Sequence, residues 1–404
     1  MNPPLRVLVN LTWLVPGVVG GSEESTTDAI RAVLEHEPSV EPTLAVLRGF
    51  AAAHPDLADA CRNEVLDSTG ANKAARVFAE QTWLARRTRE LSPDLVHHAG
   101  GVLPLRHPGR TSLTIHDLQP LEMPENFSLA KRQYLRLMLR RSAHGVDGIC
   151  VPSEFTAGRV CELLGVESAR VDVVPWSVVA LDRVAVDLGP NPAARTDGEA
   201  TGVAGDSAGT LFLYPAITYP HKNHRVLLDG FARYRQTNPE ARLVLAGGPG
   251  ASDEEVDRRC ARPDLAGSVG RPGRVSSAEM ERLYRRATAV LVPSRYEGFG
   301  LPALEAMGRG VPLVVSDAGS LPEVVATSAG WATPVAPVSP DDPAAWASAM
   351  ETVAALDERA RAEVASREVE AAAAFTPRRT AAALAGAWRR AAGRPGSTSP
   401  RSAP

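Results

Sequence analysis

The sequence predicts an α/β protein with two domains, and three observations support this. The chain has 404 residues, which is more than one domain usually holds. Short apolar runs rich in β-branched residues alternate with helical segments over residues 5–175, and the alternation restarts at residue 211. Between the two halves, residues 181–209 are rich in Gly, Pro, Ala and Asp, a composition typical of linkers.

These observations give the expected domain boundaries. We expect a first domain over residues 1–180, a flexible linker over 181–209 and a second domain over 210–375. A last helix is expected over 376–392, and the Pro- and Ser-rich tail over 393–404 is expected to be disordered.

The bulk composition excludes several function classes. The formal net charge is −3, from 44 basic and 47 acidic residues, so nothing favours nucleic acid as a partner. No run approaches 18 apolar residues, so no membrane span is predicted, and the N-terminus is expected to be a first strand rather than a signal peptide. The four cysteines lack zinc or disulfide spacing and predict reduced thiols in a cytoplasmic protein: Cys61, Cys150, Cys161 and Cys260.

The first half begins with a strand over residues 5–11 and a loop that ends in Gly20 and Gly21. Ser22 is the expected N-cap of a helix that runs to residue 34. The remaining elements expected in this half are strands over 43–47, 94–98, 111–115, 148–151 and 171–175, and helices over 73–90, over 129–144 and from the cap Ser153 onward.

Two features of the first half are candidates for function. His116 directly follows the strand over 111–115, and ligands of open α/β sheets bind at the carboxyl ends of strands, although a lone histidine is more often structural. Arg132, Arg136 and Arg140 repeat every four residues along the helix over 129–144. Such a basic stripe is usually a solvated face, and the alternative is contact with anionic membrane lipid.

In the second half, Lys222 lies in a loop between a strand over 211–214 and a helix over 223–235. An ammonium group on a loop that opens a helix suits a diphosphate, although an exposed loop lysine often has no function. The other elements expected here, before the last helix, are strands over 242–246, 268–275, 289–293 and 312–316, and helices over 277–287, over 301–308, from 320 onward and over 343–374.

The stretch over residues 289–316 reads as strand, loop, helix and strand, and it contains Glu297 in the loop and Glu305 in the helix. Pro302 lies in the first helical turn, where its missing N–H costs nothing. A helix N-terminus carries free N–H groups that suit a phosphate, and glycines allow close approach of backbone amides. The pattern therefore indicates a phosphate-bearing, hydroxyl-rich ligand; the alternative is two surface carboxylates on an ordinary turn.

The residues around these glutamates resemble the signature of the retaining glycosyltransferases of family 4, which use nucleotide sugars and have the GT-B fold. The resemblance rests on Glu-Gly-Phe-Gly-Leu-Pro at 297–302, on Glu305 and on Gly-x-Gly-x-Pro at 308–312. His-Asp-x-x-Pro at 116–120 and His-Lys-Asn-His at 221–224 resemble the family less specifically. The resemblance implies two Rossmann-like α/β domains facing across a cleft, with the C-terminal helix crossing back to the first domain.

The resemblance also implies roles for individual residues. The second domain would bind the nucleotide sugar and the first most of the acceptor. The implied catalytic residues are Glu297 at the sugar hydroxyls, His116 beside the sugar, and Lys222 on the diphosphate. The implied donor-binding residues are Glu305 on the ribose, the amides of Gly298, Phe299, Gly300 and Leu301, and Arg274 and Val275 along the base, while Gly20 and Gly21 would border the diphosphate and acceptor. No metal and no cofactor are implied, since the nucleotide sugar is a co-substrate.

The implied reaction is retaining transfer of a hexosyl group, mannosyl or rhamnosyl, to a lipid-linked glycan or polysaccharide acceptor, by a cytoplasmic enzyme with peripheral contact at the inner face of the membrane. A soluble enzyme with a small-molecule, sugar-phosphate or natural-product acceptor is the alternative. Many family members carry an arginine five or six residues before the lysine, where this chain has Ile217 and Ala216. That departure keeps a nucleotide-sugar-binding pseudoenzyme open; an epimerase of the same fold is disfavoured by the central motif.

Overall fold

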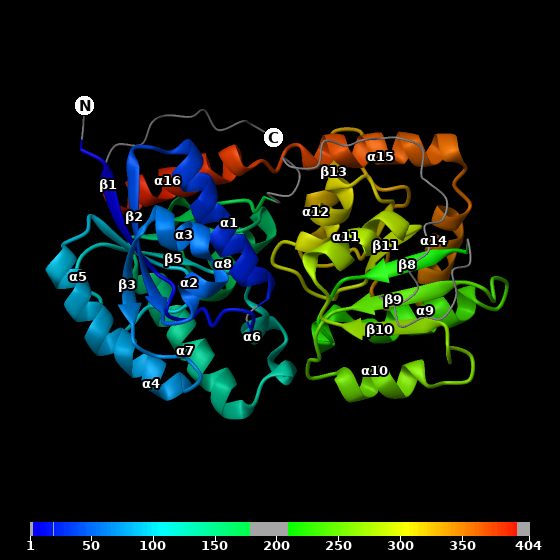
Figure 1. The fold of residues 1–404 in the computed structure, drawn as a ribbon, viewed down its shortest axis with the longest axis horizontal. Helices are drawn as coiled ribbons and strands as arrows, with labels where there is room; N and C mark the ends of the chain where they lie inside the picture. Colours follow the sequence, from blue (N-terminus) through cyan, green and yellow to red (C-terminus); the bar gives the residue numbers. More distant parts are fainter. Residues whose placement is uncertain (1–2, 19, 178–208, 394–404) are drawn as a thin grey trace. The chain divides into compact units, whose positions relative to one another are not determined.

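The computed structural model describes residues 3–18, 20–177 and 209–393, and it divides the chain into two compact units. The first unit comprises Met1–Ser177 and Phe375–Pro404, and the second comprises Val178–Ala374. Each unit is built on a parallel β-sheet with helices around it, which confirms the predicted fold class (Figure 1). The predicted linker before Gly209 and the predicted tail after Gly393 lie outside the described residues.

The first unit contains a seven-stranded sheet in the order β3-β2-β1-β4-β5-β6-β7, with every neighbouring pair parallel. Its strands are β1 (Leu5–Asn10), β2 (Val40–Leu47), β3 (Arg62–Leu66), β4 (Leu95–His98), β5 (Thr111–Thr114), β6 (Gly148–Val151) and β7 (Val171–Val173). Strand β3 was not among the sequence predictions, because its polar sequence RNEVL lacks the apolar run of the other strands.

The helices of the first unit are α1 (Gly21–His36), α2 (Phe50–Ala53), α3 (Pro55–Ala60), α4 (Lys73–Ala79), the π-turn η1 (Glu80–Leu84), α5 (Ala85–Leu91), α6 (Gln119–Glu122), the 3-10 turns η2 (Pro124–Asn126) and η3 (Ser168–Arg170), α7 (Leu129–Gly145), α8 (Glu154–Leu164) and α16 (Pro377–Ala391). Ser153 caps α8 as predicted. The prediction that Ser22 caps the first helix is wrong: Gly20 occupies the cap with φ 79°, a geometry that glycine adopts at low cost.

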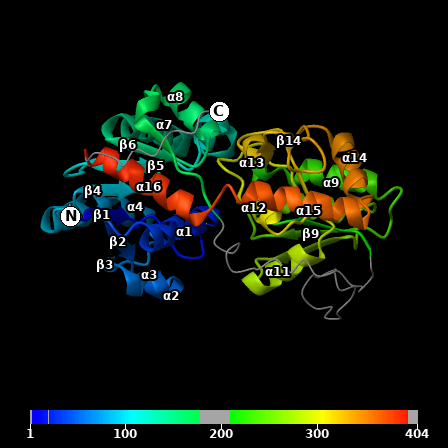
Figure 2. The same cartoon turned by 90° about the horizontal axis from the view of Figure 1, so that it is seen from above.

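The C-terminal helix α16 belongs to the first unit, as expected. It packs against α1 and against β6, and Figure 2 shows α16 beside α1. Trp388 is fully buried between this helix and the sheet, in a cluster with Val9, Leu95 and Cys150. Burying one such side chain contributes about 1.5–3 kcal/mol, so α16 is part of the core of this unit and not an appendage.

The second unit contains a five-stranded sheet in the order β10-β9-β8-β11-β12, again all parallel. Its strands are β8 (Leu211–Tyr214), β9 (Arg242–Ala246), β10 (Val269–Gly273), β11 (Ala289–Val292) and β12 (Leu313–Val315), with a separate antiparallel pair β13 (Ala326–Thr327) and β14 (Gly330–Trp331). Because β8 and β11 are neighbours in the centre, the loops that follow them meet at one edge of the sheet.

The helices of the second unit are the 3-10 turn η5 (Pro220–Lys222), α9 (His224–Tyr234), α10 (Asp253–Cys260), α11 (Ser277–Arg286), α12 (Leu301–Gly308), α13 (Leu321–Val325), α14 (Pro343–Ala354) and α15 (Glu358–Ala372). The single helical stretch predicted over 343–374 is wrong. The chain breaks it before Asp357, whose side chain accepts a hydrogen bond from the amide of Ala360 and so caps a new helix.

Candidate functional site

The loop between β11 and α12 forms the centre of the candidate site in the second unit. Helix α12 starts after Gly300, which has φ 99°. A Cβ added there would lie 2.6 Å from Cδ2 of Leu321, so both the backbone angle and the space require glycine. No side chain caps this end of α12. Pro302 has no N–H, and the amides of Ala303 and Leu304 donate to the backbone oxygen of Gly300, so this end offers the amide of Leu301 and the positive end of the helix dipole to an anionic ligand.

Glu297 and Lys222 are 75 residues apart in the sequence and form an ion pair. Nζ of Lys222 donates a hydrogen bond to Oε1 of Glu297 at 2.7 Å, and both side chains are largely buried, with 18% and 10% exposed. Oγ of Ser294 donates to the same oxygen at 2.6 Å. The two residues predicted to act on the diphosphate and on the sugar are thus brought together.

The charge state of this pair follows from its surroundings. Burial alone would raise the pKa of Glu297, but the Lys222 ammonium and the two hydrogen bonds outweigh it and lower the pKa below its usual value. Glu297 is therefore ionised at neutral pH. Burial lowers the pKa of the neighbouring His221 to about 4, and the Lys222 charge acts in the same direction, so this histidine is neutral.

Two residues that the sequence analysis missed hold this pair in position. Tyr214, at the end of β8, is fully buried, and its hydroxyl donates to the backbone oxygen of Lys222 at 2.8 Å. The same hydroxyl lies 3.2 Å from Oγ of Ser294. Tyr214 and Ser294 thus connect the lysine loop to the glutamate loop. Ser294 lies three residues before Glu297 on the same loop, which is the only sequence signal that could have found it.

The loop after β12 fixes the backbone of Glu297 from the other side. The amide and the hydroxyl of Ser320 both donate to the backbone oxygen of Glu297, at 3.2 and 3.1 Å. A Cβ on the preceding Gly319 would lie 2.6 Å from the nitrogen of Glu297, so only glycine fits. Glu297 is consequently held through its carboxylate by Lys222 and Ser294 and through its backbone by Ser320.

Glu305 lies one turn into α12, where its Oε2 accepts a hydrogen bond from the hydroxyl of Tyr284 at 2.6 Å. This bond from α11 fixes the carboxylate near the N-terminal half of α12. Arg274 and Val275 follow β10; Arg274 is exposed, and Gly248, at the end of β9, lies next to it. Phe299 contributes a side chain that is buried in the core, so its predicted role rests on its backbone alone.

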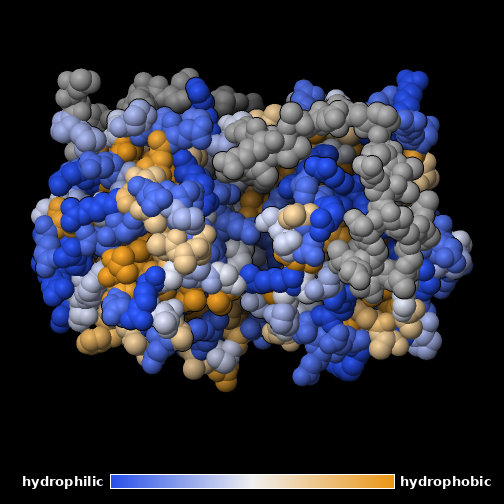
Figure 3. All heavy atoms as spheres, viewed as in Figure 1, coloured by the Kyte–Doolittle hydropathy of each residue, from blue (hydrophilic) through white to orange (hydrophobic). Residues whose placement is uncertain are grey.

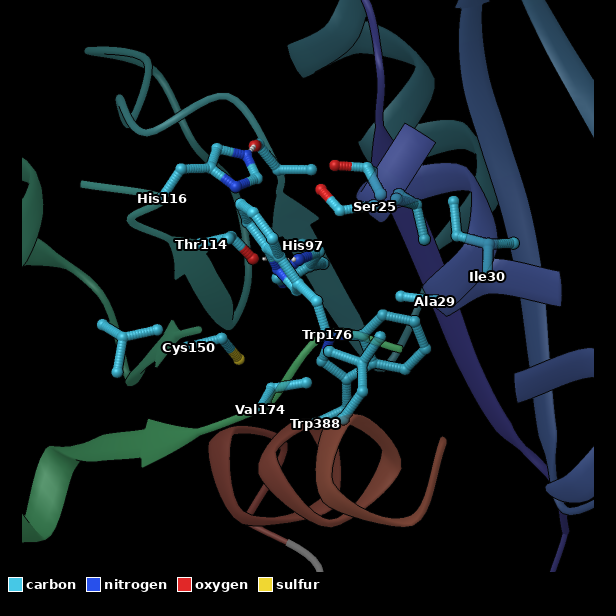
Figure 4. Close-up of a pocket in the computed structure, with 15 residues that line it drawn as sticks. Ser25, Ala29, Ile30, His97, Thr114, His116, Cys150, Val174, Trp176 and Trp388 are labelled. Carbon is cyan, nitrogen blue, oxygen red and sulfur yellow. Dashed lines mark hydrogen bonds between the residues drawn. The ribbon is translucent and has the colours of Figure 1, made fainter. Parts of the chain in front are cut away.

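In the first unit, His116 lies at the edge of a small cavity at the carboxyl end of β5, near Trp176 (Figure 4). The ring of Trp13 also lies against His116, with ring centroids 5.8 Å apart. Its Nε2 is 2.8 Å from the backbone oxygen of Ala99, which can only accept, so Nε2 carries the proton. Nδ1 then carries a lone pair, and it has no hydrogen-bond partner within the described residues. Burial lowers the pKa of His116 to about 4, so the ring is neutral at pH 7.

The cavity lies between α1, α16 and the sheet, and Figure 4 shows Ser25, Trp176 and Trp388 around it. Its volume is about 30 Å³, enough for water but not for a sugar ring. His97 lines it with both ring nitrogens hydrogen-bonded to Ser112 and Thr114, and burial lowers its pKa to about 3. This part of the first unit is polar but uncharged.

Gly20 and Gly21 form the turn at the start of α1, as predicted, but its first turn carries two carboxylates, Glu23 and Glu24. Glu23 accepts hydrogen bonds from the amide of Gly17 at 2.9 Å and approaches Nε2 of His54 at 3.0 Å. Carboxylates at a helix N-terminus satisfy the positive end of the dipole. A diphosphate contact at Gly20 and Gly21 stays a prediction, and these carboxylates weigh against it.

The described residues contain neither a helix that could span a membrane nor a cluster of metal ligands. None of the described helices is long and apolar enough to cross a membrane. Among the same residues, no three or more His, Cys, Asp or Glu side chains come together as a metal site would require. The absence of a metal from the reaction remains a prediction.

Comparison with known families assigns both halves of the chain. Residues 19–179 match the family model described as Glycosyltransferase Family 4, and residues 209–355 match the one described as Glycosyl transferases group 1. The chain belongs to glycosyltransferase family 4. The second match contains the Lys222–Glu297 pair and the whole of α12, while the first contains His116 and the turn at Gly20.

Curated relatives align with about three fifths of the chain. The O-antigen chain mannosyltransferase RfbU of Salmonella typhimurium is 25% identical over 246 residues, which cover 61% of this chain and 61% of that protein. The D-inositol 3-phosphate glycosyltransferase of Mycobacterium tuberculosis is 33% identical over 258 residues, covering 61% of this chain and 49% of the relative. The matches thus span between about half and three fifths of these relatives' own length.

Solved structures support the fold over almost the whole chain. Anabaena HepE, solved in complex with UDP and glucose, has a TM-score of 0.68 at 17% identity, with 94% of this chain and 98% of that chain covered. Sucrose-phosphate synthase from Thermosynechococcus elongatus has a TM-score of 0.69 at 17% identity, with 96% and 98% covered. At this identity the similarity establishes the GT-B fold and nothing about the substrates.

Proposed function

We propose that the protein is a retaining glycosyltransferase that moves a hexosyl group from a nucleoside-diphosphate sugar to a hydroxyl group of an acceptor. The observation that carries the proposal is the Lys222–Glu297 pair beside the uncapped N-terminus of α12. It combines a cation and the positive end of a helix for a diphosphate with a carboxylate for sugar hydroxyls. The family match of this half of the chain supports the same assignment.

The roles of the residues follow from where charge develops. When the glycosidic bond breaks, the leaving diphosphate gains negative charge, and the Lys222 ammonium and the N-terminal end of α12 stabilise it. An ammonium group has three N–H donors, of which Glu297 takes one, so Lys222 can bind a phosphate without losing the ion pair. Glu297, ionised and fixed by Ser294, orients the sugar hydroxyls as an acceptor of hydrogen bonds.

The remaining residues would contact the ribose, the base and the sugar of the nucleotide-sugar donor. Glu305 would accept hydrogen bonds from the ribose hydroxyls, with Tyr284 holding it in place. Arg274 and Val275 would lie along the base. His116 would lie against the sugar, where its unprotonated Nδ1 can accept from a hydroxyl and its neutral ring adds no charge. No metal enters this scheme, because the ammonium and the helix end meet the phosphate charge.

The proposed acceptor is a lipid-linked glycan or a polysaccharide, and the sugar is mannose or rhamnose. Support comes from relatives whose names denote O-antigen chain mannosyltransferases. A second candidate is a cytoplasmic enzyme with a sugar-phosphate or other small acceptor, because the D-inositol 3-phosphate glycosyltransferases align with the same share of this chain, 61%, at 28–33% identity.

A thermal-shift titration with UDP-, GDP-, ADP- and dTDP-sugars tests the donor site first. A ligand at about 100 times its dissociation constant adds about 2.7 kcal/mol of apparent stability. We expect one nucleotide to stabilise the wild type and to lose this effect in Glu305→Ala. A donor that binds but is neither transferred nor hydrolysed would favour the pseudoenzyme, in which the arginine absent at Ala216 and Ile217 has cost activity.

The stereochemistry needs a separate measurement. Proton NMR of the first product formed from the identified donor reports the anomeric configuration. Retention supports the proposed mechanism, whereas inversion would contradict it even if the donor site is correct.

A further inference from the structure

Asn223 directly follows Lys222 and has an unusual backbone conformation. Within residues 3–18, 20–177 and 209–393, Asn223 and Ser92 are the two residues other than glycine with a positive φ, at 57° and 46°. Asparagine tolerates this left-handed region better than most residues, because its short polar side chain can form hydrogen bonds nearby. Asn223 is also buried, with 4% of its surface exposed. A buried polar residue with such a backbone angle, next to Lys222, points to a specific role.

The side chain of Asn223 does not do what its position in the sequence suggests. Asn223 is the N-cap residue of α9, where an asparagine usually accepts a hydrogen bond from an amide of the first turn, but no such bond is present. Instead its Nδ2 donates to the backbone oxygens of Pro293 at 3.0 Å and of Pro340 at 2.7 Å. A carbonyl oxygen can only accept, so the amide nitrogen and not the amide oxygen faces both partners. Asn223 therefore joins separate loops and leaves its own helix uncapped.

The loops that Asn223 joins surround the Lys222–Glu297 pair. Pro293 lies at the start of the loop that carries Glu297, directly after β11. Pro340 lies 117 residues from Asn223 along the chain, in the segment before α14. One amide group thus connects the lysine loop to the glutamate loop and to a third segment of the second unit.

Arg295 makes two further connections between the same segments. Its amide donates to the backbone oxygen of His221 at 2.8 Å, which joins the glutamate loop to the lysine loop a second time. Its guanidinium pairs with Asp341, whose side chain is 66% exposed. Ion pairs with an exposed partner contribute little, whereas a buried carbonyl that loses its donor carries a desolvation cost. We therefore expect the two bonds of Asn223 to matter more than the Arg295–Asp341 pair.

We propose that Asn223 is a positioning residue for the transfer reaction, and that its two hydrogen bonds hold the ammonium of Lys222 on Glu297 before any ligand binds. The charge of a lysine lies at the end of a flexible four-carbon chain, so its position depends on a fixed backbone. With the lysine loop fastened, the leaving diphosphate meets a cation that does not need to reorganise. The inference rests on the proposed function of Lys222 and adds a residue to which that proposal gives no role.

The first test follows Lys222 itself and does not require activity. The chain has three lysines, Lys73, Lys131 and Lys222, so mass spectrometry after brief treatment with acetic anhydride reports the reactivity of each one. Lys73 on α4 and Lys131 on α7 are exposed and serve as internal standards; Figure 3 shows blue and orange residues mixed on the surface where Figure 1 labels these helices. In the wild type, we expect Lys222 to react more slowly than both standards, because it is mostly buried and hydrogen-bonded to Glu297.

Asn223→Gly is the decisive variant, because glycine keeps the left-handed backbone and loses only the side chain. We expect Lys222 to react about tenfold faster in this variant, which is the order of magnitude for the loss of two hydrogen bonds. Asn223→Ala removes the same bonds and also strains the backbone, so Lys222 should be at least as reactive in it as in Asn223→Gly.

The matched control is Asn63→Ala in the first unit. Nδ2 of Asn63 likewise donates to two backbone oxygens, those of Ala58 at 2.7 Å and of Cys61 at 2.8 Å. The control therefore loses the same two kinds of bond in the other unit, and Lys222 should react as in the wild type. Thermal unfolding of each variant shows that labelling is carried out on the folded chain.

Steady-state kinetics with the donor found by thermal shift give the second readout. Lys222 acts on charge that develops as the glycosidic bond breaks, so Asn223→Gly should lower kcat about tenfold, more than it raises KM for the donor. Asn63→Ala should keep the kcat of the wild type. A residue that only stabilised the fold would leave the kcat of the folded molecules unchanged.

Three results would overturn the proposal. One is a Lys222 that reacts as slowly in Asn223→Gly as in the wild type, even if Asn223→Ala frees it, since the backbone angle and not the hydrogen bonds would then hold the loop. Another is an equal gain of reactivity in Asn63→Ala. The third is an unchanged kcat in Asn223→Gly. If the labelling changes as expected but the wild type transfers no sugar, the placement of Lys222 by Asn223 is supported and the proposed function fails.

Discussion

The two units differ in the charge of their candidate sites. In the second unit, Lys222 and Glu297 form a buried ion pair. In the first unit, the pKa values of His116 and His97 are lowered by burial to about 4 and about 3, so the polar groups around the cavity are neutral. Two sheets of the same type thus carry different chemistry. We infer that the second unit recognises a charged ligand and that the first recognises hydroxyl groups.

The largest effect is expected from the loss of the buried cation. Lys222→Ala should lower kcat by roughly 100-fold or more, because the leaving diphosphate loses a preorganised charge. It also leaves Glu297 buried without its partner, which costs about 3–5 kcal/mol of stability. Steady-state kinetics and urea unfolding measure the two effects.

A matched double variant separates the loss of activity from the loss of stability. Lys222→Met with Glu297→Gln removes both charges, so it should regain most of the stability but none of the activity. Turnover of Lys222→Ala within about threefold of the wild type would contradict the assignment of a leaving-group role to Lys222.

The next effect concerns the ribose end of the second unit. Glu305→Gln should raise the dissociation constant of the nucleotide sugar by roughly 10- to 100-fold, because hydrogen bonds to a charged group contribute about 1.5–3 kcal/mol. Isothermal titration measures it. Tyr284→Phe, which removes only the bond that holds Glu305, should have a smaller effect. If both variants bind donor as the wild type does, the ribose lies elsewhere.

A smaller effect is expected from Ser294→Ala. The hydroxyl donates to Glu297 and keeps it in place, so its loss should reduce kcat/KM about two- to tenfold, the range of one ordinary hydrogen bond. The ion pair with Lys222 stays, so the fold should be unaffected. A loss as large as that of Lys222→Ala would mean that Ser294 contacts the substrate itself.

The smallest effect expected from any one residue is on the pH dependence of the free energy of unfolding. His97, His98 and His116 in the first unit, and His221 and His224 in the second, have pKa values lowered by burial to between about 3 and about 4. Their unfolded pKa is about 6.5, so the unfolded state binds more protons below that value and stability falls as pH drops from 6.5 towards 4. Between pH 7 and 6 each histidine should cost about 0.7 kcal/mol.

Hydrogen exchange resolves this pH effect by unit. The first unit has three such histidines and the second has two. On acidification, amides of β4 and β5 should therefore lose more protection from hydrogen exchange than amides of β8 and β11. Equal losses in both units would mean that the buried histidines do not set the acid response.

The strands that contain apolar runs could be predicted from the sequence. So could the glycine-containing loop between β11 and α12 in the second unit. The sequence predicted Gly300 and the start of α12 because Pro302 and the two glycines are local signals. It failed at β3, where pairing with β2 and not side-chain hydrophobicity makes a strand of a polar segment. It also failed at Ser22, because Gly20 determines where α1 begins.

The candidate site was predictable in its members but not in their contacts. Glu297 and Lys222 each lie in a recognisable motif, yet their ion pair depends on β8 and β11 being neighbours in the sheet. Tyr214 looks like an ordinary core residue at the end of a strand, and only the structure shows its hydroxyl on the lysine loop. Motifs are local in sequence, whereas the Lys222–Glu297 pair spans 75 residues and the approach of the Tyr214 hydroxyl to Ser294 spans 80.

The position of α16 has a consequence for the order in which the two units fold during synthesis. The first unit needs residues from both ends of the chain, whereas all described residues of the second unit lie in one continuous stretch. The apolar residues of the first unit that pack on Trp388, among them Val9, Leu95 and Cys150, therefore stay exposed until α16 has been synthesised. We expect the second unit to finish folding first during synthesis, although it is made later, and chaperones to engage the exposed apolar surface of the first unit meanwhile.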